Sequence, residues 1–372
     1  MEFYSKIRFI FYFLLTFVVS ILNLKAQESN TYWQMDYAQG SIIKHRKTLG
    51  YLFTNRPEYL SIGWNKKAKL NSVWRERYNY PDSGLLLIYQ NFNNKNLGSS
   101  TALNYTTTFY LRDRNVQNQF SIQLGFGFGY ITHPFNFDTN VSNVTTSTHV
   151  VTSQHLKLNY SRPRILGKFG LQGGISFTHF SNGSFKKPNL GINSIFFNLG
   201  VNYHNAEHMP LYKKSVEKEE FLKQPIHFSV SLNAGIHETK PGIGTKAVYF
   251  ANGYVHKRVA RKSNLQVGID FYNSQSAKDN ARYRSIIEGE TEPKDHKQIG
   301  VFVGHELFFN KLSLETQVGY YLYRPFVFHP RIYQKMSFKY FFNNRKSALG
   351  INLKFHNFQA EFISLGLHHQ LF

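Results

Sequence analysis

Residues 120–130 of this chain, with the sequence FSIQLGFGFGY, alternate without interruption between two kinds of side chain. Every second residue, from Phe120 to Tyr130, is aliphatic or aromatic, and the residues between them are serine, glutamine or glycine. Because successive side chains of a β-strand point to opposite faces of a sheet, this period predicts a strand with one apolar and one polar face. Residues 226–236 and 312–322 follow the same pattern, which indicates an all-β fold.

The alternation alone does not separate a membrane barrel from a soluble sandwich or a lipocalin, in which the apolar face turns inward. Three further features favour the membrane. Many alternating segments are long enough for tilted membrane strands, and the 24 Tyr and 35 Phe gather near segment ends, as in interfacial girdles. The chain also stops on an alternating segment with a terminal Phe372, which resembles the C-terminal signal of outer-membrane barrels. We therefore predict a transmembrane antiparallel up-and-down β-barrel of about 12–16 strands.

Roughly sixteen segments qualify as strands. Their approximate bounds are 41–46, 58–65, 84–92, 101–112, 120–131, 147–160, 167–181, 192–204, 226–238, 245–257, 264–273, 298–309, 311–323, 331–342, 347–357 and 359–371. Barrel termini lie on the periplasmic side, so we expect residues 182–191 to lie outside the cell. The connections 66–83 and 205–225 are long for periplasmic turns. One domain, residues 27–372, is the simplest organisation, and two barrels in tandem remain the alternative.

The N-terminus has the three-part layout of a secretory signal. Lys6 and Arg8 precede an apolar run from Phe9 to Leu22, and the small residue Ala26 precedes a plausible cleavage point. The apolar run is shorter than the roughly 20 residues that a membrane-spanning helix needs. We predict a signal peptide over residues 1–26 and export to the bacterial outer membrane.

Cysteine is absent, which excludes disulfides, thiolate chemistry and cysteine-ligated zinc. The formal charge is +22, from 44 Lys and Arg against 22 Asp and Glu, and it suits a polyanionic partner. Export argues against nucleic acid. The phosphates of lipid A, in lipopolysaccharide, are a better match for an exported barrel, although solvated basic loops explain the charge equally well.

A candidate site lies where the segment 167–181 ends. His179 and Ser181 share one face with the apolar Ile175 and Phe177, and Asn193 takes the same face at the start of the next segment. Antiparallel neighbours would bring a potential base, a potential nucleophile and an amide together on the lipid-facing side of the outer rim. The competing interpretation is that they are ordinary rim residues.

The run from His179 to Asn182, followed by Lys186 to Ile192, resembles the catalytic segment of the PagL-type lipid A 3-O-deacylases, whose longer relatives are called acyloxyacyl hydrolases. Members of this family are outer-membrane barrels that hydrolyse the acyl ester at the 3-position of lipid A. The resemblance implies that Ser181 is the nucleophile and His179 its general base, with Asn193 as third member. It also implies an oxyanion hole formed by Asn182 and nearby backbone N–H groups, including that of Ser184, and no cofactor.

Two features depart from the family pattern. Asn193 stands where the family has an acidic residue, and replacing a triad carboxylate by its amide can cost about 10⁴ in turnover, although asparagine fills this position in papain-like proteases. In addition, the chain continues from about 205 to 372, which implies a wider barrel or an added function. The alternative function is therefore a non-catalytic barrel, a pore or a scaffold, with a degenerate site.

The remaining basic residues and histidines are considered as phosphate or metal contacts. Lys186 and Lys187 are candidates for contacts to a lipid A phosphate, and a solvated pair of loop charges is an equal alternative. His368 and His369 are adjacent in a predicted strand, so they point to opposite faces and we expect no metal site there. A homodimer remains open as the assembly.

Overall fold

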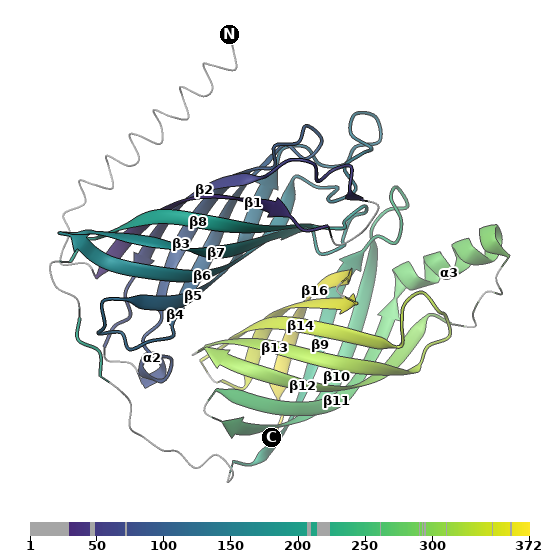
Figure 1. Cartoon of the computed structure of the whole chain (residues 1–372). Coiled ribbons are helices and arrows are strands. Elements are labelled where there is room, and N and C mark those ends of the chain that lie inside the picture. The colour runs from purple at the N-terminus through teal and green to yellow at the C-terminus, as the bar shows by residue number, and fades with distance from the viewer. Residues whose placement is uncertain are drawn as a thin grey trace.

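The computed structural model describes residues 30–372, except 45–48, 71–72, 207–209, 214–223, 261, 290, 292, 294, 310, 344 and 358. The predicted signal peptide, residues 1–26, lies outside the described residues. The strands form two closed antiparallel barrels, drawn in purple to teal and in green to yellow in Figure 1.

The first barrel contains eight strands in sequence order, and it closes where β1 pairs with β8. The strands are β1 (Thr31–Ile42), β2 (Glu58–Lys66), β3 (Asp82–Asn91), β4 (Ser99–Tyr110), β5 (Gln119–Ile131), β6 (Val150–Leu166), β7 (Phe169–Ser181) and β8 (Ile192–His204). A short helix, α2 (Val73–Arg77), lies in the connection between β2 and β3.

The second barrel has the same construction and closes where β16 pairs with β9. Its strands are β9 (Ile226–His237), β10 (Lys246–Ala260), β11 (Ser263–Ser274), β12 (Lys297–Phe309), β13 (Leu312–Tyr323), β14 (Ile332–Phe341), β15 (Ser347–His356) and β16 (Gln359–Gln370). Helix α3 (Gln275–Glu288) follows β11. No helix in the described part of the chain is both long and apolar enough to cross a membrane.

The all-β, up-and-down barrel architecture is confirmed, but the expectation of one barrel of about 12–16 strands is corrected to two barrels of eight strands each. The connection 205–225, too long for a periplasmic turn, joins the two barrels. The first predicted strand, 41–46, was also misplaced, because β1 spans Thr31–Ile42.

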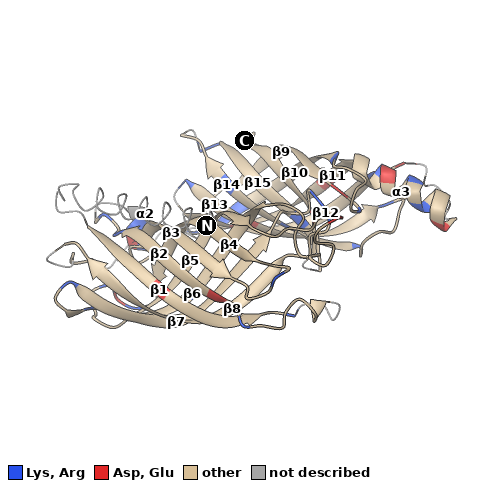
Figure 2. Ribbon diagram, turned by 90° about the horizontal axis from the view of Figure 1, so that it is seen from above, with Lys and Arg blue, Asp and Glu red and all other residues tan. Residues whose placement is uncertain are grey.

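The apolar faces of the strands point outward. On β5, Phe120, Phe126 and Phe128 are exposed, whereas Ser121 and Gln123 are buried inside the barrel. This is the reverse of a soluble sandwich or lipocalin, and it is the arrangement of a transmembrane barrel. In Figure 2 the strands of both barrels are largely free of charged residues, whereas helix α3 carries several.

Charged side chains inside the first barrel are paired among uncharged polar residues. The Lys157 ammonium lies 2.8 Å from the Asp36 carboxylate, and Gln172 donates a hydrogen bond of 2.8 Å to the same group. Both charged side chains are almost fully buried. The interior of an eight-stranded barrel is only wide enough for side chains, so neither barrel formed by the described residues has the wide interior that a solute-conducting pore would need.

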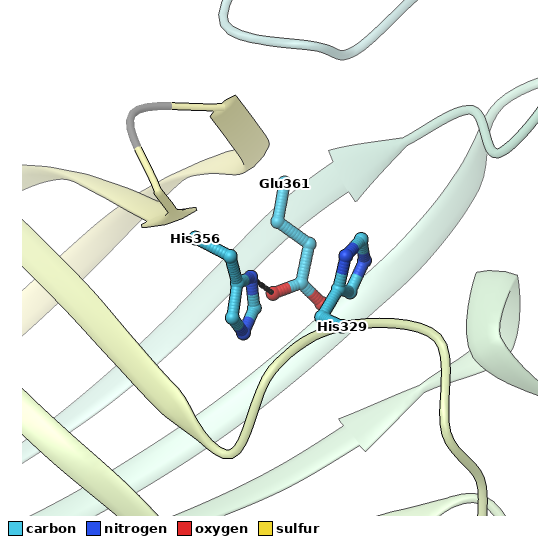
Figure 3. Close-up of side chains that lie close together, drawn as sticks. All are labelled: His329, His356 and Glu361. Atoms are coloured by element: carbon cyan, nitrogen blue, oxygen red, sulfur yellow. Dashed lines mark ion pairs between the residues drawn. The ribbon is translucent and has the colours of Figure 1, made fainter.

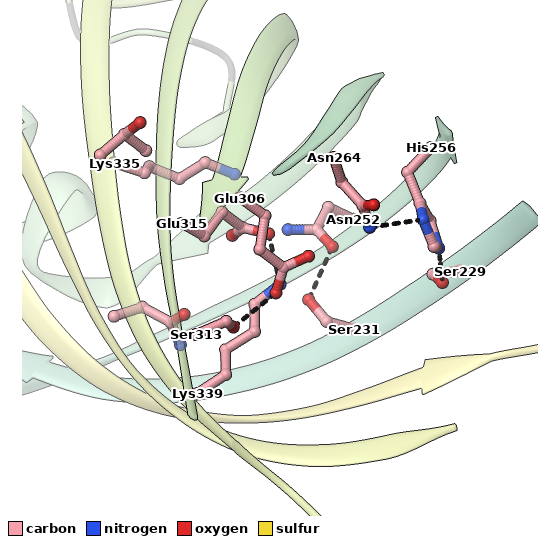
Figure 4. Close-up of polar contacts among 12 residues, drawn as sticks. Ser229, Ser231, Asn252, His256, Asn264, Glu306, Ser313, Glu315, Lys335 and Lys339 are labelled. Atoms are coloured by element: carbon pink, nitrogen blue, oxygen red, sulfur yellow. Dashed lines mark hydrogen bonds and ion pairs between the residues drawn. The ribbon is translucent and has the colours of Figure 1, made fainter. Parts of the chain in front are cut away.

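The second barrel encloses a similar polar network (Figure 4). The Lys339 ammonium pairs with Glu315 and lies 3.4 Å from Glu306, which accepts a hydrogen bond of 2.6 Å from Ser313. Buried charges are costly unless they are paired and hydrogen-bonded, so these contacts allow each closed barrel to keep polar residues inside.

The two barrels stand side by side and touch at both ends. At the end that carries the loop 182–191, which we call the outer end, the His237 ring nitrogen Nδ1 lies 3.1 Å from the backbone oxygen of Ser184. At the opposite end, Tyr78 donates a hydrogen bond to the backbone of Phe308, and its ring lies 5.4 Å from that of Phe309. Corresponding ends of the two barrels therefore lie together.

Candidate active site

The end of β7 is fixed by residues that point into the first barrel. Phe180 and its cross-strand partner Ile192 are fully buried in an apolar cluster that plugs the outer end of this barrel. Because side chains alternate along a strand, the inward Phe180 turns its neighbours His179 and Ser181 outward. Residues two apart in a strand lie about 6.6 Å apart, so an imidazole and a hydroxyl on one face are neighbours.

The predicted histidine and asparagine meet across two strands. His179 and Asn193 are direct partners in the register of β7 and β8, and the His179 ring nitrogen Nδ1 lies 2.5 Å from Asn193 Oδ1. An amide oxygen can only accept, so Nδ1 carries the proton in this contact. The other ring nitrogen, Nε2, is then left in the basic form that can take a proton.

Two donors converge on the Ser181 hydroxyl oxygen. Asn189 Nδ2 donates to it at 2.9 Å, and the backbone N–H of Gly183 donates at 3.1 Å. The Asn182 backbone N–H donates to Asn189 Oδ1 at 3.1 Å, which fixes the orientation of the Asn189 amide. Ser181 is thus held at the start of a tight loop, with hydrogen-bond donors on one side.

Asn182 and Ser184, which the resemblance implies as oxyanion donors, form hydrogen bonds within the loop 182–191 and to the loop before β6. The Asn182 side chain donates to Ser147 Oγ and to the backbone oxygen of Lys186. The Ser184 N–H donates to Asn182 Oδ1 at 2.9 Å. The groups that lie at Ser181 Oγ are therefore Asn189 and the Gly183 N–H.

The two predicted phosphate contacts differ in position. Lys186 is exposed on the loop, whereas Lys187 is half-buried and lines a groove between the barrels. The backbone N–H of Lys187 donates a hydrogen bond of 2.6 Å to Glu238 of the second barrel.

A groove between the barrels has a volume of about 1620 Å³. His179, Ser181 and Asn189 line it from the first barrel. The opposite wall is the outward face of the second barrel, including Ile351, Leu353, Phe355 and Ile363. The candidate site therefore opens onto a mostly apolar groove to which both barrels contribute.

Sequence reasoning missed two components of this site. Asn189 lies in a loop without a periodic pattern, and its only signal was its place in the Pro-Asn pair of the motif. The second barrel gave no signal at all, because the contacts of His237 and Glu238 with the loop 182–191 depend on how two barrels pack.

Closed barrels whose strands turn apolar side chains outward and polar side chains inward define a class of protein, the outer-membrane β-barrels. Residues 58–202 match the family described as lipid A 3-O-deacylase (PagL), and residues 226–372 match the acyloxyacyl hydrolase C-terminal domain. The chain therefore joins a PagL-family domain to an acyloxyacyl hydrolase C-terminal domain, and it is an outer-membrane β-barrel protein.

Solved structures and curated proteins add less. The crystal structure of the outer membrane enzyme PagL is 14% identical, with 45% of this chain and 97% of that chain covered and a TM-score of 0.33. A mutant of the Rh. blastica porin is 10% identical, with 92% of this chain and 99% of that chain covered and a TM-score of 0.21. No curated protein matches the chain. Because both TM-scores are low, the assignment rests on the family matches.

Proposed function

We propose that this protein is an outer-membrane serine esterase that hydrolyses the 3-O-acyl ester of lipid A. One observation carries the proposal: Ser181, beside the hydrogen-bonded pair of His179 and Asn193, opens onto the groove between the barrels. The match of residues 58–202 to the lipid A 3-O-deacylase family supports the same substrate.

The chemistry follows from the positions of the donors and acceptors. Ser181 Oγ attacks the ester carbonyl and gives its proton to His179 Nε2, while Asn193 holds the Nδ1–H. The Asn189 amide and the Gly183 N–H, which lie beside Ser181 Oγ, would donate to the oxyanion, and each such donor is worth about 3–4 kcal/mol. The protonated His179 then returns the proton to the sugar oxygen, which leaves. Water, activated by His179, finally releases the fatty acid from Ser181.

The groove gives the second barrel a role in this function, because it would bind the acyl chain of the substrate. An acyl chain that lies along the outward faces of both barrels would place its ester at the outer end, beside Ser181. The chain would exchange contacts with the bilayer for contacts with Leu353, Phe355 and Ile363 of the second barrel. On this proposal the C-terminal domain is one wall of the substrate site.

Mass spectra of lipid A from cells that express Ser181→Ala test the function. Because the nucleophile is lost, we expect turnover to fall by about 10⁴-fold or more, so that lipid A keeps its 3-O-acyl chain. Ser142→Ala, in an outer loop of the same barrel, is the matched control and should deacylate as the unaltered protein does. Identical spectra from folded wild-type protein and Ser181→Ala would favour a non-catalytic scaffold instead.

A further inference from the structure

Three side chains with metal-binding atoms meet at the outer end of the second barrel (Figure 3). His329 comes from the loop before β14, His356 ends β15, and Glu361 lies near the start of β16. One ligand atom from each residue lies within 4.8 Å of the other two. The imidazoles of His329 and His356 are stacked, with ring centroids 4.4 Å apart, and the Glu361 carboxylate points between them.

One ring nitrogen of this cluster is buried without a hydrogen bond. The His356 side chain is 3% exposed, and its Nδ1 lies 3.5 Å from Glu361 Oε2. Within the described part of the chain, this nitrogen has no hydrogen-bond partner. Buried polar atoms are normally hydrogen-bonded, so such an atom calls for an explanation, and a bound ion is one of the usual ones.

A hydrogen bond fixes the orientation of the His356 ring, as is usual for a histidine that binds a metal ion. Its second ring nitrogen, Nε2, lies 3.3 Å from the hydroxyl of Tyr321. A ligating histidine almost always has its other nitrogen in such a hydrogen bond, which fixes the orientation of the ring. Nδ1 is thereby left to face Glu361 and His329.

Lys354 is the group that competes for Glu361. Its ammonium lies 3.0 Å from Glu361 Oε2 and 3.7 Å from the ring centre of Tyr272. Glu361 Oε2 lies near both Lys354 and His356, so an ion held here would share the carboxylate with Lys354. The ring of Tyr272 gives the ammonium a second partner when the charge of Glu361 is shared.

We propose that His329, His356 and Glu361 bind a divalent transition-metal ion of the zinc class. Two imidazoles and one carboxylate form a ligand set that zinc uses in sites with an open fourth position. Ligand atoms of a tetrahedral zinc ion lie about 3.3 Å apart, so the cluster must contract, and the exposed loop position of His329 allows this. His329 and Glu361 also line the groove onto which Ser181 opens, so the open coordination position would face that groove.

Titration of the purified full-length protein with Zn²⁺ or Co²⁺ in detergent, after treatment with a chelator, tests the proposal without any substrate. We expect a stoichiometric site, and the visible absorption of bound Co²⁺ should report tetrahedral coordination. His329→Ala should weaken binding by more than about 10-fold, because the loss of an outer partner alone costs that much. Glu361→Gln should do the same.

His133→Ala is the matched control, since His133 lies on an outer loop of the first barrel and outside the cluster. This variant should bind the ion as tightly as the wild-type protein. The proposal is overturned if His329→Ala retains the wild-type affinity, or if the wild-type protein takes up no stoichiometric ion. Because His329→Ala changes only a loop side chain, a loss of folding does not obscure the result, and thermal unfolding checks this directly.

Discussion

Asn193 is the residue on which the activity of the proposed site depends most. Its Oδ1 accepts the Nδ1–H of His179, so the imidazole has the correct tautomer, but a neutral amide stabilises the imidazolium less than a carboxylate would. Hydrogen bonds to charged groups exceed neutral ones by about 1–2 kcal/mol. The amide therefore provides orientation without most of the charge stabilisation.

Asn193→Asp tests this view of the triad, because aspartate keeps the shape of asparagine and adds the charge. We expect kcat for lipid A deacylation to rise by roughly 5- to 30-fold, from the extra stabilisation of the protonated His179. Asn118→Asp is the control for added charge, since the exposed Asn118 also accepts a hydrogen bond, from Tyr160, far from the site. An unchanged kcat in Asn193→Asp would mean that charge at this position does not limit the reaction.

The shared face of His179, Ser181 and Asn193 could be predicted from the sequence, because a strand alternates its side chains and each of these residues lies in step with the apolar residues of its strand. Asn189 could not be placed in the same way. Its contact with Ser181 depends on the path of the loop 182–191, which includes left-handed backbone at Gly183, Ser184 and Gly191. No period in the sequence encodes such a path.

At the scale of elements, Gly191 connects the loop 182–191 to β8. Its φ of +76° favours glycine, and a Cβ atom there would lie 3.0 Å from Cε1 of His179. The bare backbone of Gly191 therefore lets the imidazole lie against the turn. The bounds of β8 were predicted correctly from alternation, whereas this contact between a turn and a ring needs the three-dimensional fold.

Gly191→Ala should disturb the imidazole while the barrel stays intact. The left-handed conformation costs an alanine about 1–2 kcal/mol, and displacement of the His179 ring, the proposed general base, should lower kcat by roughly 10- to 100-fold. Gly167→Ala is the matched control, because its φ is +57° and nothing lies within 4 Å of an added Cβ. Equal kcat values for the two variants would show that backbone strain alone, and not contact with His179, causes any loss.

At the scale of the whole molecule, the closure into two barrels decides what the site can bind. Local alternation predicted nearly all of the strands, but it carries no information on whether β8 pairs with β1 or with a later strand. The pairing of Tyr32 with His204 closes the first barrel and leaves the second to form a separate wall. The groove results from this division, because a single wide barrel would have no second outward face beside Ser181.

Leu353→Trp tests whether the second barrel forms part of the substrate site. Leu353 lies on β15 and lines the groove, so an indole at this position should occupy space that the acyl chain needs. We expect kcat/KM for lipid A to fall by about 10-fold or more, since even small changes in apolar contact cost about 1–3 kcal/mol. A short-chain soluble ester does not reach Leu353, and its hydrolysis should not change.

Leu349→Trp is the matched control, because Leu349 is exposed on the same strand and outside the groove lining. If Leu353→Trp leaves both substrates unaffected, the acyl chain must lie on the first barrel alone or in the surrounding bilayer.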